Sequence, residues 1–213
     1  MIDTEVLYNR QKSLDLHIPE SVAIVGAGGI GSWVAFNLAL TGVKKLWIMD
    51  FDILEIHNLN RTPYTTLQVD ITKVEALVEE IVKRRPDIKI YPVNAKWEDL
   101  GSFIDLIDKE VDLWIDCKDD DKPLPVPKEK LYIKLAYDGD EVTFHFNPHH
   151  KTIHVWSTVD APNGYTVTPS WLVPPQLVAN LVTYMICREM LPTEEKIVTF
   201  SVKDIVENII LGG

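Results

Sequence analysis

Four glycines, Gly26, Gly28, Gly29 and Gly31, fall within six positions between a short β-branched run and a segment with helical apolar spacing. A glycine-rich turn that opens a helix directs backbone N–H groups and the positive end of the helix dipole at a ligand, which suits phosphate. Asp50 lies 19 residues after Gly31, close to the ~20 expected for an acid that hydrogen-bonds a ribose. These residues predict a nucleotide site and fit a nicotinamide dinucleotide as well as ATP; a tight turn without a ligand is the alternative.

Polar and cationic residues follow the strand that ends at Asp50. Asn58 and Arg61 come soon after it, and Lys73 opens the next helical pattern. The pyrophosphate of a dinucleotide is held mainly by N–H groups, whereas a triphosphate that releases pyrophosphate also needs cations around it. Taken singly, Arg61 and Lys73 fit ordinary surface charges. Together with the glycine turn and Asp50, they favour a triphosphate.

A further pair of acids follows the apolar run at 111–115. Asp116 ends this run, and Asp119 comes three residues later in the stretch DCKDD. An acid at this position can reach over the edge of a sheet and hold Mg²⁺ on a phosphate, because that ion prefers hard oxygen ligands. A charged surface loop that binds no ligand would explain the sequence of these residues equally well.

The elements that must position these residues alternate between strand and helix in the first half of the chain. Strands are expected at 21–25, 44–52, 88–93 and 111–116, and helices at 30–42, 71–85 and 101–108. Apolar strands with intervening helices indicate an α/β, Rossmann-like, largely parallel sheet that helices cover on both faces. In such a sheet, ligands gather at the carboxyl ends of the strands, where the turn, Asp50 and Asp119 all fall.

The second half has a different pattern. A strand at 131–137 and a hairpin of strands 141–146 and 152–158 indicate antiparallel pairing. A long helix at 174–191 opens with proline, and strands at 196–202 and 207–213 are expected to end the fold. The histidines around the hairpin, His145, His149, His150 and His154, raise the alternative of a metal site, but they lack an accompanying carboxylate pattern.

Composition limits the class of protein. The 213 residues, 46% of them hydrophobic, suffice for one domain, and the net charge of −11 argues against a nucleic-acid partner. The uncharged stretch 24–43 is long enough to span a membrane, but its central glycines, Asn37 and Thr41 argue against that role. The start of the chain lacks the pattern of a secretory signal. With only two cysteines and no Cys-x-x-Cys pair, the sequence is that of a cytoplasmic protein without structural zinc.

Six short stretches, taken in order, resemble the ThiF/MoeB/HesA family of adenylating enzymes, the bacterial relatives of ubiquitin-activating enzyme. They are YNRQ (8–11), GAGGIGS (26–32), DFD (50–52), NLNR (58–61), TKVE (72–75) and DCKD (116–119). The order and spacing are far more specific than any one stretch. The helix that begins PPQLVANLVTYM is also similar to that of the family.

The resemblance implies an enzyme that catalyses the reaction of ATP with a carboxylate to give an acyl-adenylate and pyrophosphate. It implies a single adenylation domain over 1–213, with an N-terminal arm (1–20), a nucleotide-binding half (21–120) and a substrate and dimer half (121–213). It further implies a homodimer whose substrate is the C-terminus of a small ubiquitin-like or sulfur-carrier protein or of a peptide.

The resemblance also assigns roles to residues. The four glycines would cradle phosphates, Asp50 and Asp52 would bind the nucleotide, and Asp119 would hold Mg²⁺. Asn58, Arg61 and Lys73 would neutralise charge at the α-phosphate, and Arg10 would be inserted into the site of the neighbouring subunit.

Three departures from the family pattern affect the expected chemistry. The stretch DDDKPLPVP contains three prolines and is expected to be a loop rather than a helix, and the zinc-binding cysteine pairs are missing. Residues 157–170 hold no cysteine where thiol-using members carry their nucleophile, and the acidic neighbours of Cys117 do not favour a thiolate. We therefore expect no enzyme thioester. The alternatives are an NAD-dependent oxidoreductase and a catalytically silent partner subunit.

Overall fold

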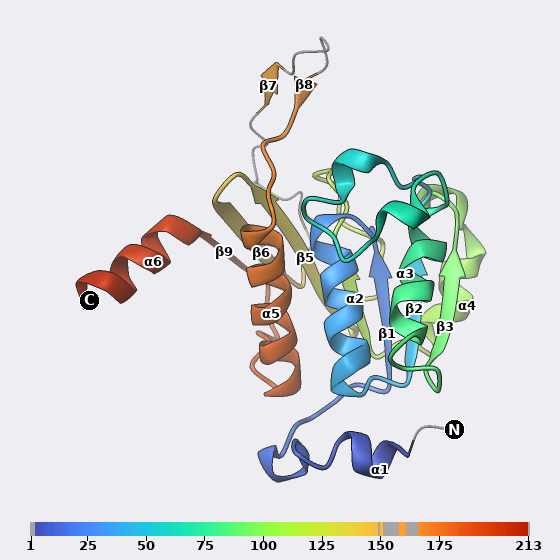
Figure 1. Ribbon diagram of the computed structural model, residues 1–213. Coiled ribbons are helices and arrows are strands. Elements are labelled where there is room, and N and C mark those ends of the chain that lie inside the picture. Colours follow the sequence, from blue (N-terminus) through green and yellow to red (C-terminus); the bar gives the residue numbers. More distant parts are fainter. Residues whose placement is uncertain (1–2, 149, 151–157, 161–165, 213) are drawn as a thin grey trace.

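The computed structural model describes residues 3–148, 150, 158–160 and 166–212. Within this part of the chain, one sheet has the strand order β3-β2-β1-β4-β5-β6-β9 (Figure 1). Neighbouring strands are parallel from β3 to β5, and β6 pairs antiparallel with both β5 and β9. The predicted Rossmann-like α/β sheet with an antiparallel continuation is confirmed.

The strands of the main sheet are β1 (Ser21–Val25), β2 (Lys45–Met49), β3 (Lys89–Val93), β4 (Leu113–Asp116), β5 (Leu131–Asp138), β6 (Glu141–Phe146) and β9 (Lys196–Ser201). A separate two-stranded ribbon pairs β7 (Val159–Asp160) with β8 (Thr166–Val167). The helices are α1 (Thr4–Leu7), α2 (Gly29–Thr41), α3 (Lys73–Val82), α4 (Ser102–Asp108), α5 (Val173–Cys187) and α6 (Val202–Leu211).

Helices cover the sheet on both faces, as predicted. The larger core cluster joins the sheet to α2, α3 and α5 through residues such as Val34, Leu77 and Val182. A smaller cluster lies on the opposite face under α4 and includes Ile107 and Trp114. Every residue of β1 is buried, which explains why that strand is an unbroken apolar run after its first residue.

Local signals in the sequence set the ends of the helices that border the site. The C-cap of α2 is Gly42, whose φ of 127° favours glycine and whose N–H donates to the carbonyl of Leu38. At the start of α3, Thr72 and Glu75 form a reciprocal capping box. Because α2 and α3 both begin at the carboxyl edge of the sheet, the glycine turn, the segment after β2 and the loop after β4 meet along that edge.

The expectation of a final strand at 207–213 is wrong. Residues Val202–Leu211 form α6, and the side chain of Ser201 caps this helix by accepting a hydrogen bond from the N–H of Lys203. Apolar residues at Val202, Val206 and Ile209 recur at helical spacing, and this periodicity is more informative than the short apolar run.

The strand predicted at 152–158 lies outside the described residues except for Thr158. Its predicted hairpin with 141–146 is wrong, because β5 and β9 pair with the two edges of β6. The loop predicted for the proline-rich stretch is confirmed, since no helix or strand forms between β4 and β5. Among the helices that the structure describes, none has the length and hydropathy needed to cross a membrane.

Candidate nucleotide-binding site

The glycine turn connects the end of β1 to α2, and two of its glycines are required by close contacts. Gly26 has a φ of +93°, and a Cβ atom there would lie 2.8 Å from the carbonyl oxygen of Cys117. At Gly31, a Cβ atom would lie 1.8 Å from the carbonyl oxygen of Gly26. At Gly28, by contrast, no described heavy atom lies within 4 Å of the Cβ position. The turn therefore leaves open space beside Gly28 at the N-terminus of α2, where a phosphate can be held.

This difference predicts opposite outcomes for two glycine-to-alanine variants. We expect Gly31→Ala to destabilise the fold, because the added methyl group collides with backbone. We expect Gly28→Ala to unfold at nearly the wild-type temperature and to bind ATP at least about tenfold more weakly, because its methyl group occupies the open space. Thermal unfolding and calorimetric titration with ATP measure the two effects. Unchanged ATP affinity in Gly28→Ala would show that the nucleotide does not use this space.

Asp50 is tied to the glycine turn by hydrogen bonds. Its Oδ2 accepts from the N–H of Ala27 at 2.6 Å, and its Oδ1 accepts from the N–H of Asp52 at 2.7 Å. Burial raises the pKa of Asp50, and the charge of Lys73 and the two N–H groups act in the opposite direction. Each carboxylate oxygen keeps a second lone pair, so the geometry leaves Asp50 able to accept from a ribose hydroxyl.

Tyr64 also fixes the turn, and the sequence analysis missed it. Its hydroxyl donates to the carbonyl of Ala27 at 2.6 Å from a buried position. Burial raises the pKa of Tyr64 well above its usual value, and the charge of Asp50 acts in the same direction, so the phenol stays protonated and donates. Tyr64 lies in a loop with no periodic pattern, so no signal in the sequence connects it with the glycines.

Lys73 and Asp52 form an ion pair beside Asp50. Lys73 Nζ lies 2.6 Å from Asp52 Oδ2, and the N–H of Lys73 donates to the carbonyl of Asp52 at 2.9 Å. Lys73 is 9% exposed and Asp52 is half-buried. The structure thus brings the predicted cation to the acids that follow β2, close enough to Asp50 for its charge to influence that carboxylate.

Asn58 and Arg61 lie in the loop that follows, and both side chains bind their own segment. Asn58 is buried and accepts from the N–H of Glu55 through Oδ1. Arg61 Nη1 donates to the carbonyl of His57 at 2.7 Å and to Asn60 Oδ1 at 3.0 Å. The carbonyl of Arg61 accepts from Trp33 Nε1 in α2 at 3.0 Å. The loop is therefore held against the start of α2, but Arg61 must release local contacts to reach a ligand.

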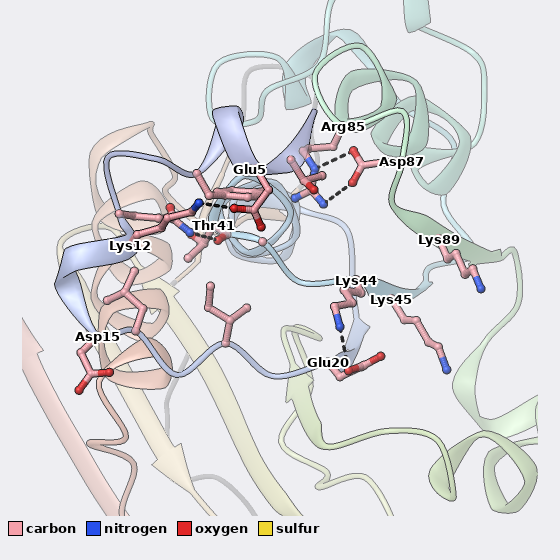
Figure 2. A pocket seen from close by; sticks show the side chains of 16 residues that line it. Glu5, Lys12, Asp15, Glu20, Thr41, Lys44, Lys45, Arg85, Asp87 and Lys89 are labelled. Atoms are coloured by element: carbon pink, nitrogen blue, oxygen red, sulfur yellow. Dashed lines mark hydrogen bonds and ion pairs between the residues drawn. The ribbon is translucent and has the colours of Figure 1, made fainter. Parts of the chain in front are cut away.

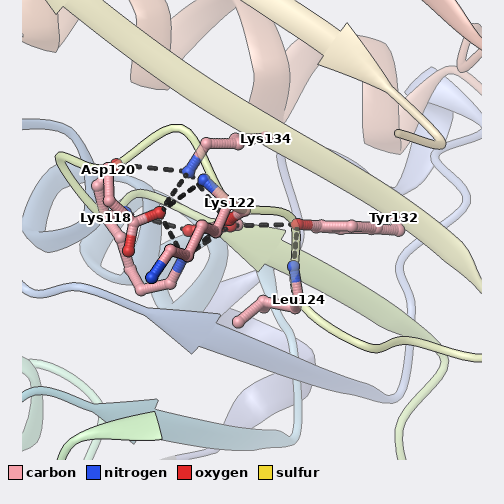
Figure 3. Close-up of polar contacts among 7 residues, drawn as sticks. Lys118, Asp120, Lys122, Leu124, Tyr132 and Lys134 are labelled. Carbon is pink, nitrogen blue, oxygen red and sulfur yellow. Dashed lines mark hydrogen bonds and ion pairs between the residues drawn. The ribbon is translucent and has the colours of Figure 1, made fainter. Parts of the chain in front are cut away.

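Asp116 is fully buried and accepts hydrogen bonds from a group of side chains that the sequence analysis did not foresee. Figure 3 shows Lys118, Tyr132 and Lys134 of this group. Asp116 Oδ2 accepts from Tyr132 Oη at 2.9 Å, Lys118 Nζ at 3.1 Å and Lys134 Nζ at 3.2 Å. Lys118 Nζ also donates to Asp120 Oδ1 at 3.0 Å. We call Asp116, Lys118, Asp120 and Lys134 the charge cluster. Its two acids and two lysines balance, which removes the cost of an unpaired buried charge.

Asp119 lies between two members of the charge cluster and is itself exposed. Because the side chains of Lys118 and Asp120 bind each other, the loop is anchored on both sides of Asp119. The preceding Cys117 lies against Gly26 through its carbonyl group. Asp119 is thus the exposed acid of a fixed loop that contacts the glycine turn, and its oxygen atoms suit Mg²⁺. In the described part of the chain, no group of three or more His, Cys, Asp or Glu residues could hold a metal ion by itself.

Arg10 does not join these residues. Gln11, its neighbour, donates to the carbonyl of Thr41 at the C-terminal end of α2. From Gly29 to Thr41, α2 is about 18 Å long, so the N-terminal arm lies at the opposite end of the sheet from the glycine turn. A cavity of about 630 Å³ separates this arm from the amino ends of the strands, and Lys44, Lys45 and Lys89 border it (Figure 2).

Neither cysteine has the environment of a nucleophile. Burial raises the pKa of Cys117, and the adjacent charge of Asp116 acts in the same direction. Burial also raises the pKa of Cys187, which packs in α5. Both thiols are free, and both are expected to stay protonated near neutral pH.

Comparison with known proteins finds a family match and several relatives that are similar in sequence to part of this chain. The family model described as the ThiF family matches residues 10–126. Ubiquitin-like modifier-activating enzyme 5 of Caenorhabditis elegans is 35% identical over 109 residues, 47% of this chain and 26% of that protein. The tRNA threonylcarbamoyladenosine dehydratase 2 of Saccharomyces cerevisiae is 36% identical over 100 residues, 46% of this chain and 22% of that protein. The matched segment spans about a quarter of the length of these relatives.

Solved structures share the fold. The crystal structure of PaaA aligns over 94% of this chain and 71% of its own, with a TM-score of 0.68 and 21% identity. Escherichia coli MccB, solved with ATP, aligns over 85% of this chain and 63% of its own, with a TM-score of 0.58 and 21% identity. Because the ThiF family model covers more than half of the sequence, including the glycine turn, Asp50 and Asp119, the chain belongs to the ThiF family.

Proposed function

We propose that the protein catalyses ATP-dependent adenylation of a carboxylate. The observation that carries this proposal is the meeting of the glycine turn, Asp50 and the Lys73–Asp52 ion pair at the carboxyl ends of β1 and β2. Membership of the ThiF family supports it, as does the MccB structure that contains ATP. An NAD-dependent oxidoreductase would not need Lys73 and Asp119 beside the turn, and a silent partner subunit would not need to keep them.

The proposed reaction is a displacement at the α-phosphorus of ATP. An oxygen of the acceptor carboxylate attacks this phosphorus, and the bond to the oxygen that bridges the α- and β-phosphates breaks. Pyrophosphate leaves with that electron pair, and an acyl-adenylate remains. Such transfers are accelerated mainly by positioning and by charge stabilisation. The N–H groups of the turn would hold phosphate oxygens, and Asp50 and Asp52 would orient the ribose of ATP. Asn58, Arg61 and Lys73 would stabilise the negative charge that develops around the α-phosphate during the transfer.

Asp119 is the residue we assign to Mg²⁺. It offers an exposed carboxylate on an anchored loop, which fits a hard cation held jointly with phosphate oxygens. When bound, the ion supplies charge neutralisation for the triphosphate.

The acceptor we propose is the C-terminal carboxylate of a small ubiquitin-like or sulfur-carrier protein, or of a peptide. Supporting observations are the relatives named as ubiquitin-like modifier-activating enzymes and the MccB structure with N-formylated MccA. A net charge of −11 would attract a basic partner. We further propose that the protein is cytoplasmic, because its free cysteines suit a reducing compartment.

Pyrophosphate exchange tests this function. Labelled pyrophosphate should enter ATP only when Mg²⁺ and a suitable carboxylate are present, because the label returns through the acyl-adenylate. The acceptors to compare are peptides with different free C-termini, including Gly-Gly, and the same peptides with a C-terminal amide as the control. Binding of NAD without binding of ATP would refute the proposal.

Because burial raises the pKa of both Cys117 and Cys187, we predict that the enzyme forms no thioester. We expect the double variant Cys117→Ala and Cys187→Ala to keep its exchange activity, with some loss of stability, on the order of 1 kcal/mol, from core packing at Cys187. Intact-mass spectrometry of the wild type after reaction with ATP and acceptor should find no thiol-sensitive adduct. An adduct that disappears in Cys117→Ala alone would contradict this expectation and would make Cys117 a nucleophile.

A further inference from the structure

Tyr137 places a hydroxyl group directly at the start of α2. A Cβ atom at Gly29, the first residue of that helix, would lie 2.6 Å from Tyr137 Oη. The same Oη lies 2.5 Å from Ser170 Oγ. Both side chains are half-buried. Two hydroxyl groups from distant parts of the sequence therefore meet beside the N-terminus that the proposed function assigns to phosphate.

Backbone contacts hold Ser170 in this place. The carbonyl of Pro169 accepts from the N–H of Gly139 at 3.0 Å, in the turn between β5 and β6. The carbonyl of Ser170 accepts from Asn60 Nδ2 at 3.4 Å, and Asn60 Oδ1 in turn accepts from Arg61 Nη1. Because these contacts use the backbone of Pro169 and Ser170, the Ser170 hydroxyl can be removed without breaking them.

The sheet order places this pair on the side of the turn away from Asp50 and Asp52. β2, which carries Asp50 and Asp52, adjoins β1 on one side, and β4 and then β5, which carries Tyr137, follow on the other. The acids after β2 and Lys73 therefore border the turn on the β2 side. The pair lies on the other side of the turn, where the loop after β4 also carries Asp119. The acceptor carboxylate would approach the α-phosphorus from this side.

The chemistry of the pair suits a carboxylate. One hydroxyl hydrogen is shared between Tyr137 and Ser170, so one hydrogen remains to be donated outward. A hydrogen bond from a neutral donor to a carboxylate is charge-assisted and fixes its direction. Unlike a lysine, such a donor does not cancel the charge that makes the carboxylate nucleophilic.

We propose that the hydroxyl pair of Tyr137 and Ser170 binds and orients the acceptor carboxylate for attack on the α-phosphate. This inference rests on the proposed adenylation. The pair, with Tyr137 in β5 and Ser170 before α5, would help the enzyme to select an acceptor with a free C-terminal carboxylate. It does so without an additional charged residue.

The test separates binding of the acceptor from binding of ATP. Tyr137→Phe and Ser170→Ala are each compared with wild type in pyrophosphate exchange, using the peptide from the panel that gives the highest wild-type rate. We expect the KM for the peptide to rise on the order of tenfold or more, the scale for losing a hydrogen bond to a charged group. The KM for ATP and its calorimetric Kd should change less than about twofold. The double variant should resemble each single variant, because either change breaks the pair.

Tyr184→Phe is the matched control, since Tyr184 is 57% exposed near the far end of α5. An unchanged KM for the peptide in both variants would overturn the inference, as would a rise in the KM for ATP alone. A wild-type protein that supports exchange with no carboxylate would instead refute the adenylation proposal itself. The two failures are therefore distinguishable.

Discussion

Replacing Lys73 with alanine is expected to lower Mg²⁺-dependent pyrophosphate exchange on the order of 100-fold or more, the scale for removing a charge partner of a transition state. Lys73 Nζ is held at 2.6 Å from Asp52 at the start of α3, so its charge is already in place before a ligand binds. Arg61→Ala is expected to lower exchange to a similar extent, although Arg61 must first exchange its contact with the His57 carbonyl for a phosphate.

Lys83→Ala is the control for Lys73→Ala, because it removes a lysine from the opposite end of the same helix, α3. Lys83 is the C-cap of α3, more than half exposed, and pairs with Glu80 rather than with the acids after β2. Its exchange rate should stay within about twofold of wild type, because Lys83 pairs with the buried Glu80 and the loss of this pair affects the stability of α3 rather than the site. All variants need a thermal unfolding curve, because Lys73→Ala removes a buried partner of Asp52. Near-normal exchange by a folded Lys73→Ala variant would remove Lys73 from the proposed site.

The second large effect concerns Arg10 and requires a homodimer. We propose that each active site receives Arg10 from the partner subunit, a device that stabilises charge on phosphate. In the structure, Gln11 anchors the arm at the C-terminal end of α2, so the length of that helix separates Arg10 from the glycine turn of its own chain. Arg10→Ala alone is therefore expected to be nearly inactive, although Arg10 is exposed and distant.

Mixing two inactive variants tests the origin of the arginine. When Arg10→Ala and Lys73→Ala subunits exchange, half of the dimers are mixed, and each mixed dimer has one site without either substitution. Roughly a quarter of wild-type sites should be restored if the sites act independently. Native mass spectrometry verifies the exchange of subunits. Verified mixed dimers without recovered activity would show that Arg10 acts within its own chain, and an active Arg10→Ala variant would show that Arg10 has no role; the adenylation proposal would stand in either case.

The sequence predicted those features that depend on local patterns. Apolar strands, the helix that ends at Gly42 and the capping residues of α3 all leave short-range signals, and the structure confirms the helix and strand assignments built on them. The spacing between Gly31 and Asp50 led to the prediction that Asp50 binds a ribose, and the structure places Asp50 beside the glycine turn through a hydrogen bond that the spacing did not predict. The N–H group that it binds belongs to Ala27, a residue without a side-chain signal of its own.

Contacts between distant segments were not predictable from one sequence. Tyr64 binds Ala27 across 37 positions, and Lys134 reaches Asp116 across 18. A lysine within an apolar run gives no sign of its partner, because pairing depends on the order of strands in the sheet. The final helix was missed for a different reason: its apolar residues are consecutive at Ile209, Ile210 and Leu211, which imitates a buried strand.

The charge cluster around Asp116 restricts how this region can change over evolutionary time. Asp116 and Lys134 have fully buried side chains, so losing either one upsets the balance of two acids and two lysines and leaves a net charge in the interior, at a cost of up to about 3–5 kcal/mol. Replacing both with apolar residues is far less costly, but a lineage would first have to pass through one of the unstable single replacements. The two positions are therefore expected to be inherited together, and Lys118 and Asp120 with them, because they complete the same charge balance.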